Sequence, residues 1–414
     1  MKKSQSGSLI IIFICWLAYL MSYLGRSDYS VCILDIVVST GVSRSTAGMV
    51  SSSFALCNAL GQLACTAIVD RVSPIKIIAA ELISVSIINT LFPIMNNFYI
   101  MALLWGINGC IQATLLCSIT RIFAESLDQV WLTRGTVLLN TIGAVGSVIN
   151  YLLAPLLISF FNWQIVFFTV ACMLFITGVV WCVVMPKLKN KLYLGIQHEI
   201  IKEKDIQNIR SNAFAVKSNY IICSILIVFI VGGFRESVSL WIPSYINDMY
   251  KYSIEKSTII TVFVPMLQIV GALIAGRIGR LVGNLFVPVL ITFAITIVCF
   301  VLLIFSIEIS VFLSICLFVI NAISMTAALT FVLSLYPVRC VSRKNIPKLV
   351  GLLNFFVHFG DFFASMGLGA LSSLIGWNFT FLVMVSLGFC GMIISFVALK
   401  FEDERRCNNV KDNI

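Results

Sequence analysis

Two arginines lie inside long apolar stretches of this sequence, each close to a carboxylate. Arg26 and Asp28 interrupt YLMSYLGRSDYSVCI, residues 19–33, and Arg235 and Glu236 interrupt IVFIVGGFRESVSLWIP, residues 227–243. An arginine embedded in a membrane costs roughly 2.5–3.5 kcal/mol on insertion scales, so it normally faces a cavity or a partner. A guanidinium can donate paired hydrogen bonds to a phosphate or a carboxylate. We therefore predict that Arg26 and Arg235 bind an anion.

Both arginines have a carboxylate nearby, so a structural ion pair is an alternative to anion binding. Asp28 is two residues from Arg26, and Glu236 is adjacent to Arg235. Residues one or two apart on a helix do not face each other, which disfavours pairing within one helix but not across a cavity. We therefore keep Asp28 and Glu236 as candidates for ion pairing or ion coupling.

A histidine and an aspartate in a later apolar stretch are candidates for proton transfer. His358 and Asp361 in LLNFFVHFGDFFASMGLGAL are three residues apart, so on a helix they share one face. Ionisable groups inside membrane segments often belong to proton relays. Proton coupling therefore stays open, and the alternative is that His358 is a hydrogen-bonded core residue.

The composition indicates a membrane-spanning scaffold for these residues. Of the 414 residues, 60% are hydrophobic and 11% are charged, with a mean hydropathy of +1.03; a soluble domain carries roughly 25% charge. About 20 apolar residues suffice for a transmembrane helix. We expect an all-α polytopic membrane protein with twelve transmembrane helices, which start near Leu9, Ser45, Pro74, Phe98, Thr133, Trp163, Asn219, Ser257, Leu285, Ser310, Leu349 and Trp377.

The remaining residue types do not indicate catalysis. The fourteen cysteines occur singly along the apolar stretches, as small apolar residues do, without the spacing of metal ligands or of a disulfide framework. The sequence has no recognisable nucleophile–base pair, metal cluster or glycine-rich phosphate loop. We therefore expect no enzyme, no cofactor and no bound metal.

The basic residues predict the orientation in the membrane. With twelve spans and the N-terminus inside, 23 of the 28 lysines and arginines fall on the inner side, and only Arg44, Lys251 and Lys256 fall outside. This is the positive-inside pattern. We expect a multi-pass protein of the inner (cytoplasmic) membrane, surrounded by lipid, with both termini cytoplasmic. The formal net charge of +10 reflects this topology, so we expect no nucleic-acid partner.

A hydrophilic segment divides the chain into two halves. We expect an N-terminal six-helix bundle over residues 1–185 and a C-terminal six-helix bundle over residues 219–400. Between them residues 186–218 form a cytoplasmic linker that is partly helical, and residues 401–414 form a cytoplasmic tail.

Residues recur between the halves at fixed offsets, which indicates an internal repeat. An offset of 209 relates Arg26 to Arg235, Arg71 to Arg280 and Arg134 to Arg343, and an offset of 214 relates LLN at 138–140 to LLN at 352–354, Gly146 to Gly360 and Trp163 to Trp377. We attribute the change of offset to a five-residue insertion near RKNIPKL. This parallel six-plus-six repeat resembles the architecture of the major facilitator superfamily, which implies a substrate site near the membrane midplane between the halves.

Short motifs resemble the organophosphate:phosphate antiporter family of that superfamily, which includes the glycerol-3-phosphate and hexose-phosphate transporters. GRSDYS, residues 25–30, resembles the first-span motif with its arginine, and FRESVSLWIPSY, residues 234–245, resembles the seventh-span arginine followed by W-x-P-x-Y. NGCIQ, residues 108–112, is similar to the fourth-span N-G-x-x-Q, but the usual Trp-Pro-Pro does not follow. The resemblance implies that Arg26 and Arg235 bind the phosphate of the substrate, alternately with inorganic phosphate.

Two departures from that family point to a less highly charged substrate. The glycerol-3-phosphate branch has a lysine where this chain has Gln62 and a histidine where it has Asn140. A carboxylate such as a sugar acid is therefore an alternative to a phosphate ester. The stretch RSDYS also resembles the R-x-N-x-S of the anion:cation symporter family, which moves such carboxylates.

Further residues complete the expected site and its gate. TAIVDRVSPIK, residues 66–76, resembles the superfamily's G-x-x-x-D-R-x-G-R-R loop, which implies that Asp70 and Arg71, with Arg280 in the second half, form a gate. Beside the two arginines, the expected substrate-binding residues are Tyr23, Tyr29, Gln62, Gln112, Asn140, Trp241 and Asn354.

These features together predict a secondary active transporter for a small organic anion, either an organophosphate or a carboxylate. We expect a monomer that works by alternating access, with phosphate or a proton as the counter-ion. Two alternatives stay open: a transporter-like receptor that senses an anion, and an exporter of lipophilic compounds, for which Asp361 would be the embedded acid.

Overall fold

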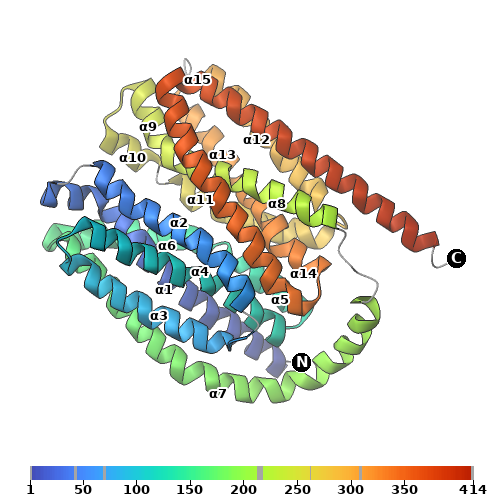
Figure 1. Ribbon diagram of the computed structural model, residues 1–414. Coiled ribbons are helices and arrows are strands. Elements are labelled where there is room, and N and C mark those ends of the chain that lie inside the picture. Colours follow the sequence, from blue (N-terminus) through green and yellow to red (C-terminus); the bar gives the residue numbers. More distant parts are fainter. Residues whose placement is uncertain are drawn as a thin grey trace. The chain divides into compact units, whose positions relative to one another are not determined.

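The computed structural model describes residues 2–41, 44–68, 71–211, 218–261, 263–306 and 310–411, and these residues are almost entirely helical (Figure 1). No strand occurs in this part of the chain. A helix satisfies its own backbone N–H and C=O groups, which is what a chain this apolar requires in lipid. The predicted all-α fold is confirmed.

Ten helices in the described residues are long and apolar enough to cross a membrane. The predicted second span is the serine-containing helix α2 (Arg44–Ile68). The predicted seventh span is divided into α8 (Ser218–Gly232), a π-helical segment η2 (Gly233–Ser237) and α9 (Val238–Tyr250). With these two additions the helices match the twelve predicted spans.

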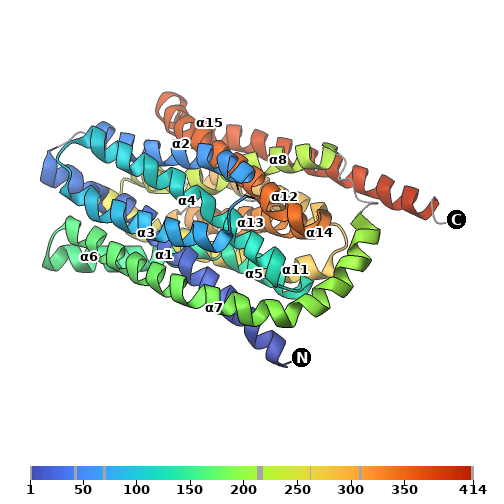
Figure 2. The ribbon, with the colours of Figure 1, turned by 60° about the horizontal axis from the view of Figure 1, so that its bottom comes forward.

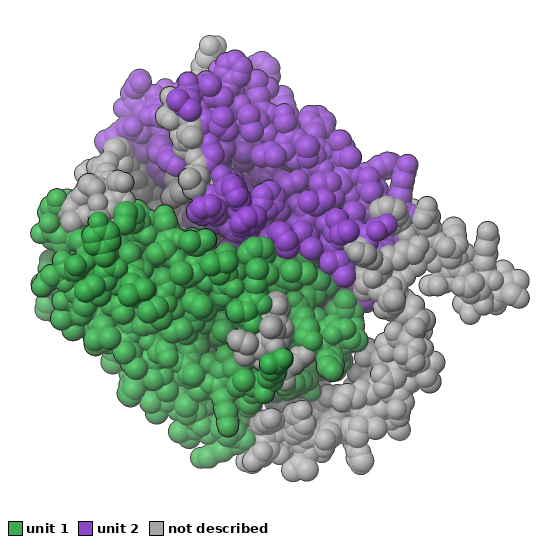
Figure 3. All heavy atoms as spheres, viewed as in Figure 1, with its two compact units in different colours: residues 1–214, 341–355 green, residues 215–340, 356–414 purple. Residues whose placement is uncertain are grey.

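A first compact unit comprises residues 1–214 and 341–355 (Figure 3). In this unit α2 packs against α4, α3 packs against α4 and α7, and α1 packs against α6 and α7. Figures 1 and 2 both show α3 running beside α7. Its elements, besides α2 and the start of α15, are α1 (Lys2–Thr40), α3 (Pro74–Leu91), η1 (Phe92–Ile94), α4 (Phe98–Ser126), α5 (Gln129–Leu139), α6 (Ile142–Phe160), α7 (Trp163–Ser211) and η4 (Arg343–Asn345).

Helix α7 includes both the sixth span and most of the segment predicted as a linker. It runs for 49 residues from Trp163 to Ser211 and contains Pro186. Residues 212–217 of the predicted linker lie outside the described part of the chain.

A second compact unit comprises residues 215–340 and 356–414. In it α13 packs against α11 and α12. The elements that follow α9 are α10 (Ile254–Thr261), α11 (Phe263–Leu281), α12 (Phe286–Ser306), α13 (Val311–Leu329), the π-helical segment η3 (Thr330–Leu335), α14 (Tyr336–Cys340) and, from residue 356, α15 (Ile346–Lys411).

A glycine separates the eleventh and twelfth spans within α15. Gly376 has φ 80° and ψ 170°, a conformation that glycine adopts without the steric cost of a Cβ atom. The last candidate span runs from Leu374 to Lys400, so it starts three residues before the predicted Trp377.

Each unit has its own aromatic core. In the first unit, Tyr29, Phe92, Trp105 and Phe167 are buried in one cluster, with ring centroids 4.8–6.0 Å apart. In the second unit, Tyr245 lies 5.4 Å from Trp377 and 5.2 Å from Phe381. These clusters hold the first span of each half against the spans that follow it.

Equivalent hydrogen bonds in the two units support the internal repeat. The indole N–H of Trp163 donates to Ser39 Oγ at 3.0 Å, and the indole N–H of Trp377 donates to Asp248 Oδ2 at 3.0 Å. Ser39 and Asp248 are 209 residues apart, and the tryptophans are 214 apart. The offsets found in the sequence therefore relate residues that form equivalent hydrogen bonds in the two halves.

One predicted pair of the repeat is wrong. Asp128 caps α5 by accepting from the Trp131 N–H, and Ser342 occupies the corresponding position before η4, so the offset is already 214 here. Arg134 is exposed inside α5, whereas Arg343 lies at the start of η4. The extra residues of the second half therefore precede Ser342 and are not in RKNIPKL.

Candidate functional site

Arg26 lies near the middle of α1 with a half-buried side chain. Its guanidinium carbon is 4.8 Å from the centroid of the Tyr23 ring and 5.9 Å from that of Phe54. Such cation–π contacts orient a guanidinium without using its N–H donors. Arg26 forms no ion pair with any described residue, so its donors are available to a ligand.

Tyr23 supports Arg26 from one turn earlier on α1. A Cβ atom on Gly146 would lie 2.4 Å from Tyr23 Cδ1, so the absence of a side chain at Gly146 makes room for the ring. The Tyr23 hydroxyl is 3.2 Å from the Ser147 hydroxyl. These contacts fix α1 against α6 at the level of Arg26.

Amide side chains surround the two carbonyls that precede Arg26. Asn89, Asn108 and Gln112 donate to the Gly25 carbonyl at 3.2, 3.0 and 3.4 Å. Asn150 donates to the Leu24 carbonyl at 3.1 Å. Buried amide side chains are stable when they are hydrogen-bonded in this way. These amides from α3, α4 and α6 hold the segment of α1 that carries Arg26.

Asp28 is fully buried in the first unit and forms no ion pair among the described residues. Its Oδ1 accepts from the Tyr29 N–H at 2.7 Å, and its Oδ2 has no hydrogen-bond partner in the described structure. The local Arg26–Asp28 pair, which was the structural alternative for Arg26, is therefore not formed.

A second buried carboxyl, Glu81 on α3, was missed by the sequence analysis. Its side chain is 1% exposed and its Oε1 accepts from the Ser22 hydroxyl at 2.5 Å. The signal was present, because AAELISVS places a lone glutamate inside an apolar span. It was overlooked because it has no arginine near it in the sequence.

Arg235 of the second unit lies in the π-helical segment η2 and is half-buried. Short π-helical segments inside α-helices frequently mark functional sites. The segment is held close to α15: a Cβ atom on Gly232 would lie 2.1 Å from the Val357 carbonyl oxygen, and one on Gly360 would lie 1.9 Å from that of Phe229. The side chain of Glu236 lies outside what the structure describes.

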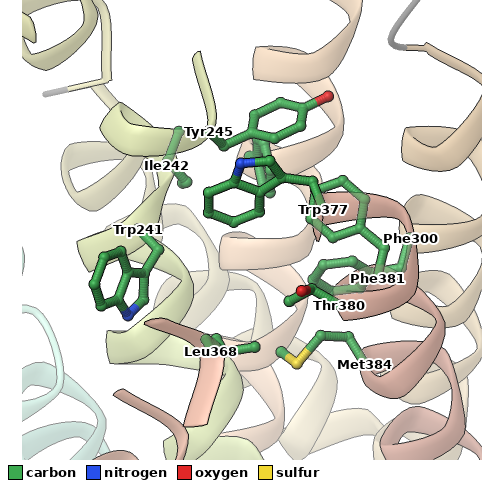
Figure 4. Close-up of a pocket in the computed structure, with 10 residues that line it drawn as sticks. Trp241, Ile242, Tyr245, Phe300, Leu368, Trp377, Thr380, Phe381 and Met384 are labelled. Atoms are coloured by element: carbon green, nitrogen blue, oxygen red, sulfur yellow. The ribbon is translucent and has the colours of Figure 1, made fainter. Parts of the chain in front are cut away.

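Trp241 on α9 lines a pocket in the second unit that is mainly aromatic (Figure 4). Figure 4 shows the rings of Trp377, Tyr245 and Phe381 grouped together, with centroids 5.2–6.1 Å apart. The Thr380 hydroxyl donates a 2.9 Å hydrogen bond to the Gly376 carbonyl. A lining of this kind suits apolar groups and supplies no cation for an anion.

Other predicted substrate-binding residues differ in how exposed they are. Tyr29 is fully buried in the core of the first unit and its hydroxyl donates to the Ala47 carbonyl at 2.7 Å, so its ring packs inside the bundle. Gln62 and Asn354 are buried. Asn140 is half-buried at the break between α5 and α6. Breaks in transmembrane helices often line transport sites.

The predicted coupling and gate residues are partly described. His358 and Asp361 are half-buried on α15. Arg71 and Arg280 are exposed, and Asp70 lies outside the described residues.

Two other arginines, which the sequence does not place in the substrate site, donate to backbone carbonyls. Arg121 donates to the Val72 carbonyl at 2.9 Å and pairs with Glu125 at 2.7 Å. Arg343 donates to the carbonyls of Ala124 and Leu127, at the end of α4. Cations are favourable there because the last carbonyls of a helix lack partners.

The cysteines whose side chains the structure describes are all free. Two of them, Cys65 on α2 and Cys117 on α4, are buried against each other. No group of three or more potential metal ligands occurs among the described residues.

The chain matches the family model described as Major Facilitator Superfamily over residues 15–342. Two curated proteins are similar to it. Membrane sensor protein UhpC of Escherichia coli (strain K12) is 22% identical over 172 residues, which is 42% of this chain and 39% of that protein. The chloroplastic sodium-dependent phosphate transport protein 1 of Arabidopsis thaliana is 21% identical over 282 residues, which is 65% of this chain and 54% of that protein.

Solved transporter structures share the fold. The proton:xylose symporter XylE bound to 6-bromo-6-deoxy-D-glucose superimposes with a TM-score of 0.77 at 12% identity, covering 95% of this chain and 96% of that one. The human organic anion transporter MFSD10 (TETRAN) superimposes with a TM-score of 0.67 at 11% identity, covering 94% and 99%.

Proposed function

Because the chain belongs to the Major Facilitator Superfamily, whose members are membrane transporters, we propose that it moves a small organic anion across the inner membrane by alternating access. The bundles of residues 1–185 and 219–400 rock about a central substrate, and both termini face the cytoplasm. The protein works as a monomer in lipid.

One observation carries this proposal: a half-buried arginine recurs at the same position of both halves. Arg26 and Arg235 are 209 residues apart, the offset that also relates Ser39 to Asp248 in the two tryptophan hydrogen bonds. Parallel repeats bring equivalent residues to similar depth. Two guanidiniums at one depth can bind one phosphate or carboxylate through charge-assisted hydrogen bonds.

The polar residues around the arginines favour an anion of low charge. Gln62, Gln112 and Asn140 are neutral, so Arg26 and Arg235 supply the positive charge of the site. A monocarboxylate such as a sugar acid carries one negative charge, so it needs fewer cations in its site than a phosphate dianion does. The name of the Arabidopsis relative supports inorganic phosphate as a second ligand or counter-ion.

A binding experiment tests the anion site directly. Bound ligand stabilises the folded protein, by about 2.7 kcal/mol at a hundred times the Kd. We expect the melting temperature of the purified protein to rise with at least one of gluconate, succinate, glycerol 3-phosphate, glucose 6-phosphate or inorganic phosphate. The substitutions Arg26→Gln and Arg235→Gln should each abolish this rise, and Arg134→Gln, an exposed arginine on α5, should keep it. Retention of the full rise in both site variants would refute the arginine clamp.

A sensor is the second candidate function, because the E. coli relative is named as a membrane sensor. Liposomes containing the purified protein separate the two functions. A transporter exchanges the stabilising anion across the liposome membrane, whereas a sensor binds the anion without any flux.

A further inference from the structure

The first unit contains a carboxyl group that the proposed anion site does not use. Glu81 on α3 is 1% exposed, and among the described residues it forms no ion pair. Its Oε1 accepts the Ser22 hydroxyl hydrogen bond at 2.5 Å, and its Oε2 has no hydrogen-bond partner in the described structure. An ionised carboxylate that is buried without a cation is strongly disfavoured, whereas a neutral carboxylic acid is not.

The ionisable groups on the helices around Glu81 do not compensate a charge there. Helix α3 packs against α1, α4 and α7, and no group on these helices forms an ion pair with Glu81 in the described structure. Arg121 on α4 pairs with Glu125, and Lys76 on α3 is exposed. Besides Glu81, the ionisable groups described on these four helices are Cys15, Tyr19, Tyr23, Arg26, Asp28, Tyr29, Cys32 and Asp35; Lys76; Tyr99, Cys110, Cys117, Arg121 and Glu125; and Cys172, Cys182 and Lys187.

The fold itself does not require an acid at this place. Helix α12 is the third helix of the second half, as α3 is of the first, and from Phe286 to Ser306 it contains no charged residue. A bundle of the same architecture therefore packs without a carboxyl group on its third helix. The buried carboxyl of Glu81 is therefore a feature of the first half that the third helix of the second half does not share.

Polar groups lead from Glu81 toward Arg26. Its partner Ser22 is three residues before Gly25, whose carbonyl accepts the amides of Asn89, Asn108 and Gln112. Asp28, the other buried carboxyl, is six residues after Ser22, which is about 9 Å along a helix axis. The first unit therefore buries two carboxyl contacts and these amide hydrogen bonds along one stretch of α1, from Ser22 to Asp28.

We propose that Glu81 is a proton-binding residue of the first bundle, which holds a proton in this conformation and exchanges it with water during the transport cycle. The Glu81 O–H bond breaks, the proton passes to water and the carboxylate remains; the reverse step restores the acid. This inference rests on the proposed transport function. It identifies H⁺ as the ion whose movement is coupled to that of the substrate. It adds a residue on α3 to the candidates His358 and Asp361 on α15.

Infrared spectroscopy of the purified full-length protein tests the proposal without any anion. A protonated carboxyl has a carbonyl stretch that a carboxylate or an amide does not have. We expect Glu81 and the similarly unpaired Asp28 both to contribute to such a band in the wild type. Glu81→Gln should remove the Glu81 component, and that component should shift when water is replaced by D₂O. The band should also fall reversibly as the pH is raised. The matched control is Glu125→Gln, which removes a carboxyl on α4 that is already paired with Arg121 and should leave the band unchanged.

Two results would overturn the proposal. If Glu81→Gln leaves the protonated-carboxyl band intact, Glu81 is ionised; if the band does not shift in D₂O, its proton is sealed in the core and does not exchange. If Glu81→Gln does not fold, the variant Ser22→Ala provides a second test. Loss of the Ser22 hydrogen bond should move the Glu81 band to higher frequency, and an unmoved band would contradict the assignment.

The outcome is separable from that of the proposed function. Arg26→Gln should leave the Glu81 band in place while it abolishes stabilisation by anions. Failure of the clamp therefore shows in the thermal-shift experiment, and failure of the proton site shows in the spectrum.

Discussion

At the scale of single residues, the arginines differ in whether neighbouring groups already bind their guanidinium N–H donors. Arg26 contacts aromatic ring faces and forms no described ion pair, whereas Arg121 is used by Glu125 and the Val72 carbonyl. The difference follows from position, since Arg121 has Glu125 one turn away on α4 and the Val72 carbonyl within reach, whereas Arg26 has neither kind of partner among the described residues. Only the first kind of arginine is suited to a ligand.

The form of the Arg26 side chain gives a first prediction. Arg26→Lys keeps the charge but replaces a planar fork with a single ammonium group. We expect anion affinity to fall roughly tenfold or more, because a hydrogen bond to a charged group contributes about 1.5–3 kcal/mol. Titration of the melting temperature with the stabilising anion measures this loss. Unchanged affinity would mean that Arg26 acts as a point charge and not as a bidentate donor.

The amides around Gly25 give a second prediction, which concerns stability. Gln112 donates to Asn108 Oδ1 at 2.9 Å and both donate to the Gly25 carbonyl. We expect Asn108→Leu and Gln112→Leu each to lower the melting temperature and the double variant to lower it by less than the sum. Groups in one network couple by about 0.5–3 kcal/mol. Strict additivity in the thermal-unfolding cycle would contradict a shared network.

At the scale of helices, close approach depends on glycine at a few crossings. Gly360 on α15 faces the backbone of α8, and backbone atoms cannot move aside as a flexible side chain can. Gly146 on α6 also permits a close approach, but the neighbouring atoms are those of the Tyr23 ring on α1. Gly146 faces α1, which carries Arg26, and Gly360 faces α8, which directly precedes the segment η2 that carries Arg235.

Gly360 gives a third prediction, with a control on the same helix. In Gly360→Ala the new Cβ atom would lie 1.9 Å from the Phe229 carbonyl oxygen, so α8 and α15 must separate. Overpacking of this kind costs about 1–3 kcal/mol or more. Gly367→Ala meets no described atom within 4 Å and should be tolerated. Equal melting temperatures for the two variants in detergent would refute the tight crossing.

At the scale of the whole molecule, duplication explains why two distant segments share a chemistry. Trp163 and Trp377 donate equivalent hydrogen bonds in the two units, and each bond joins the last span of its half to the first. The halves have nevertheless diverged, since Glu81 occurs on α3 and no charged residue occurs on α12. In the proposed function, the arginines shared by the two halves bind the anion together, and Glu81 acts in the first bundle alone.

The distribution of basic residues gives a fourth prediction, about orientation. A reporter that fluoresces only in the cytoplasm should be active when fused after residue 200 or at the C-terminus, and a periplasmic phosphatase should be inactive there. The reverse activities are expected for fusions near Lys251, in the loop between α9 and α10. Activity of the phosphatase at residue 200 would contradict the positive-inside assignment.

Sequence alone was sufficient for the membrane fold, the twelve spans and the repeat, because each depends on local hydropathy or on the order of residues along the chain. Arg26 and Arg235 were recognisable for the same reason, since a charge in an apolar span is visible without any contact. The mistaken pairing of Arg134 with Arg343 shows the limit, because an offset cannot locate an insertion between matched residues.

Tertiary structure alone decided which polar groups meet. Ser22 reaches Glu81 across 59 residues of chain, and Asn150 reaches Leu24 across 126. Tyr29 became a core residue for the same reason, because its hydroxyl finds the Ala47 carbonyl at the adjacent helix. A helix face has no fixed partner until neighbouring helices pack on it, so burial, hydrogen-bond partners and the proton site on α3 follow from packing and not from spacing.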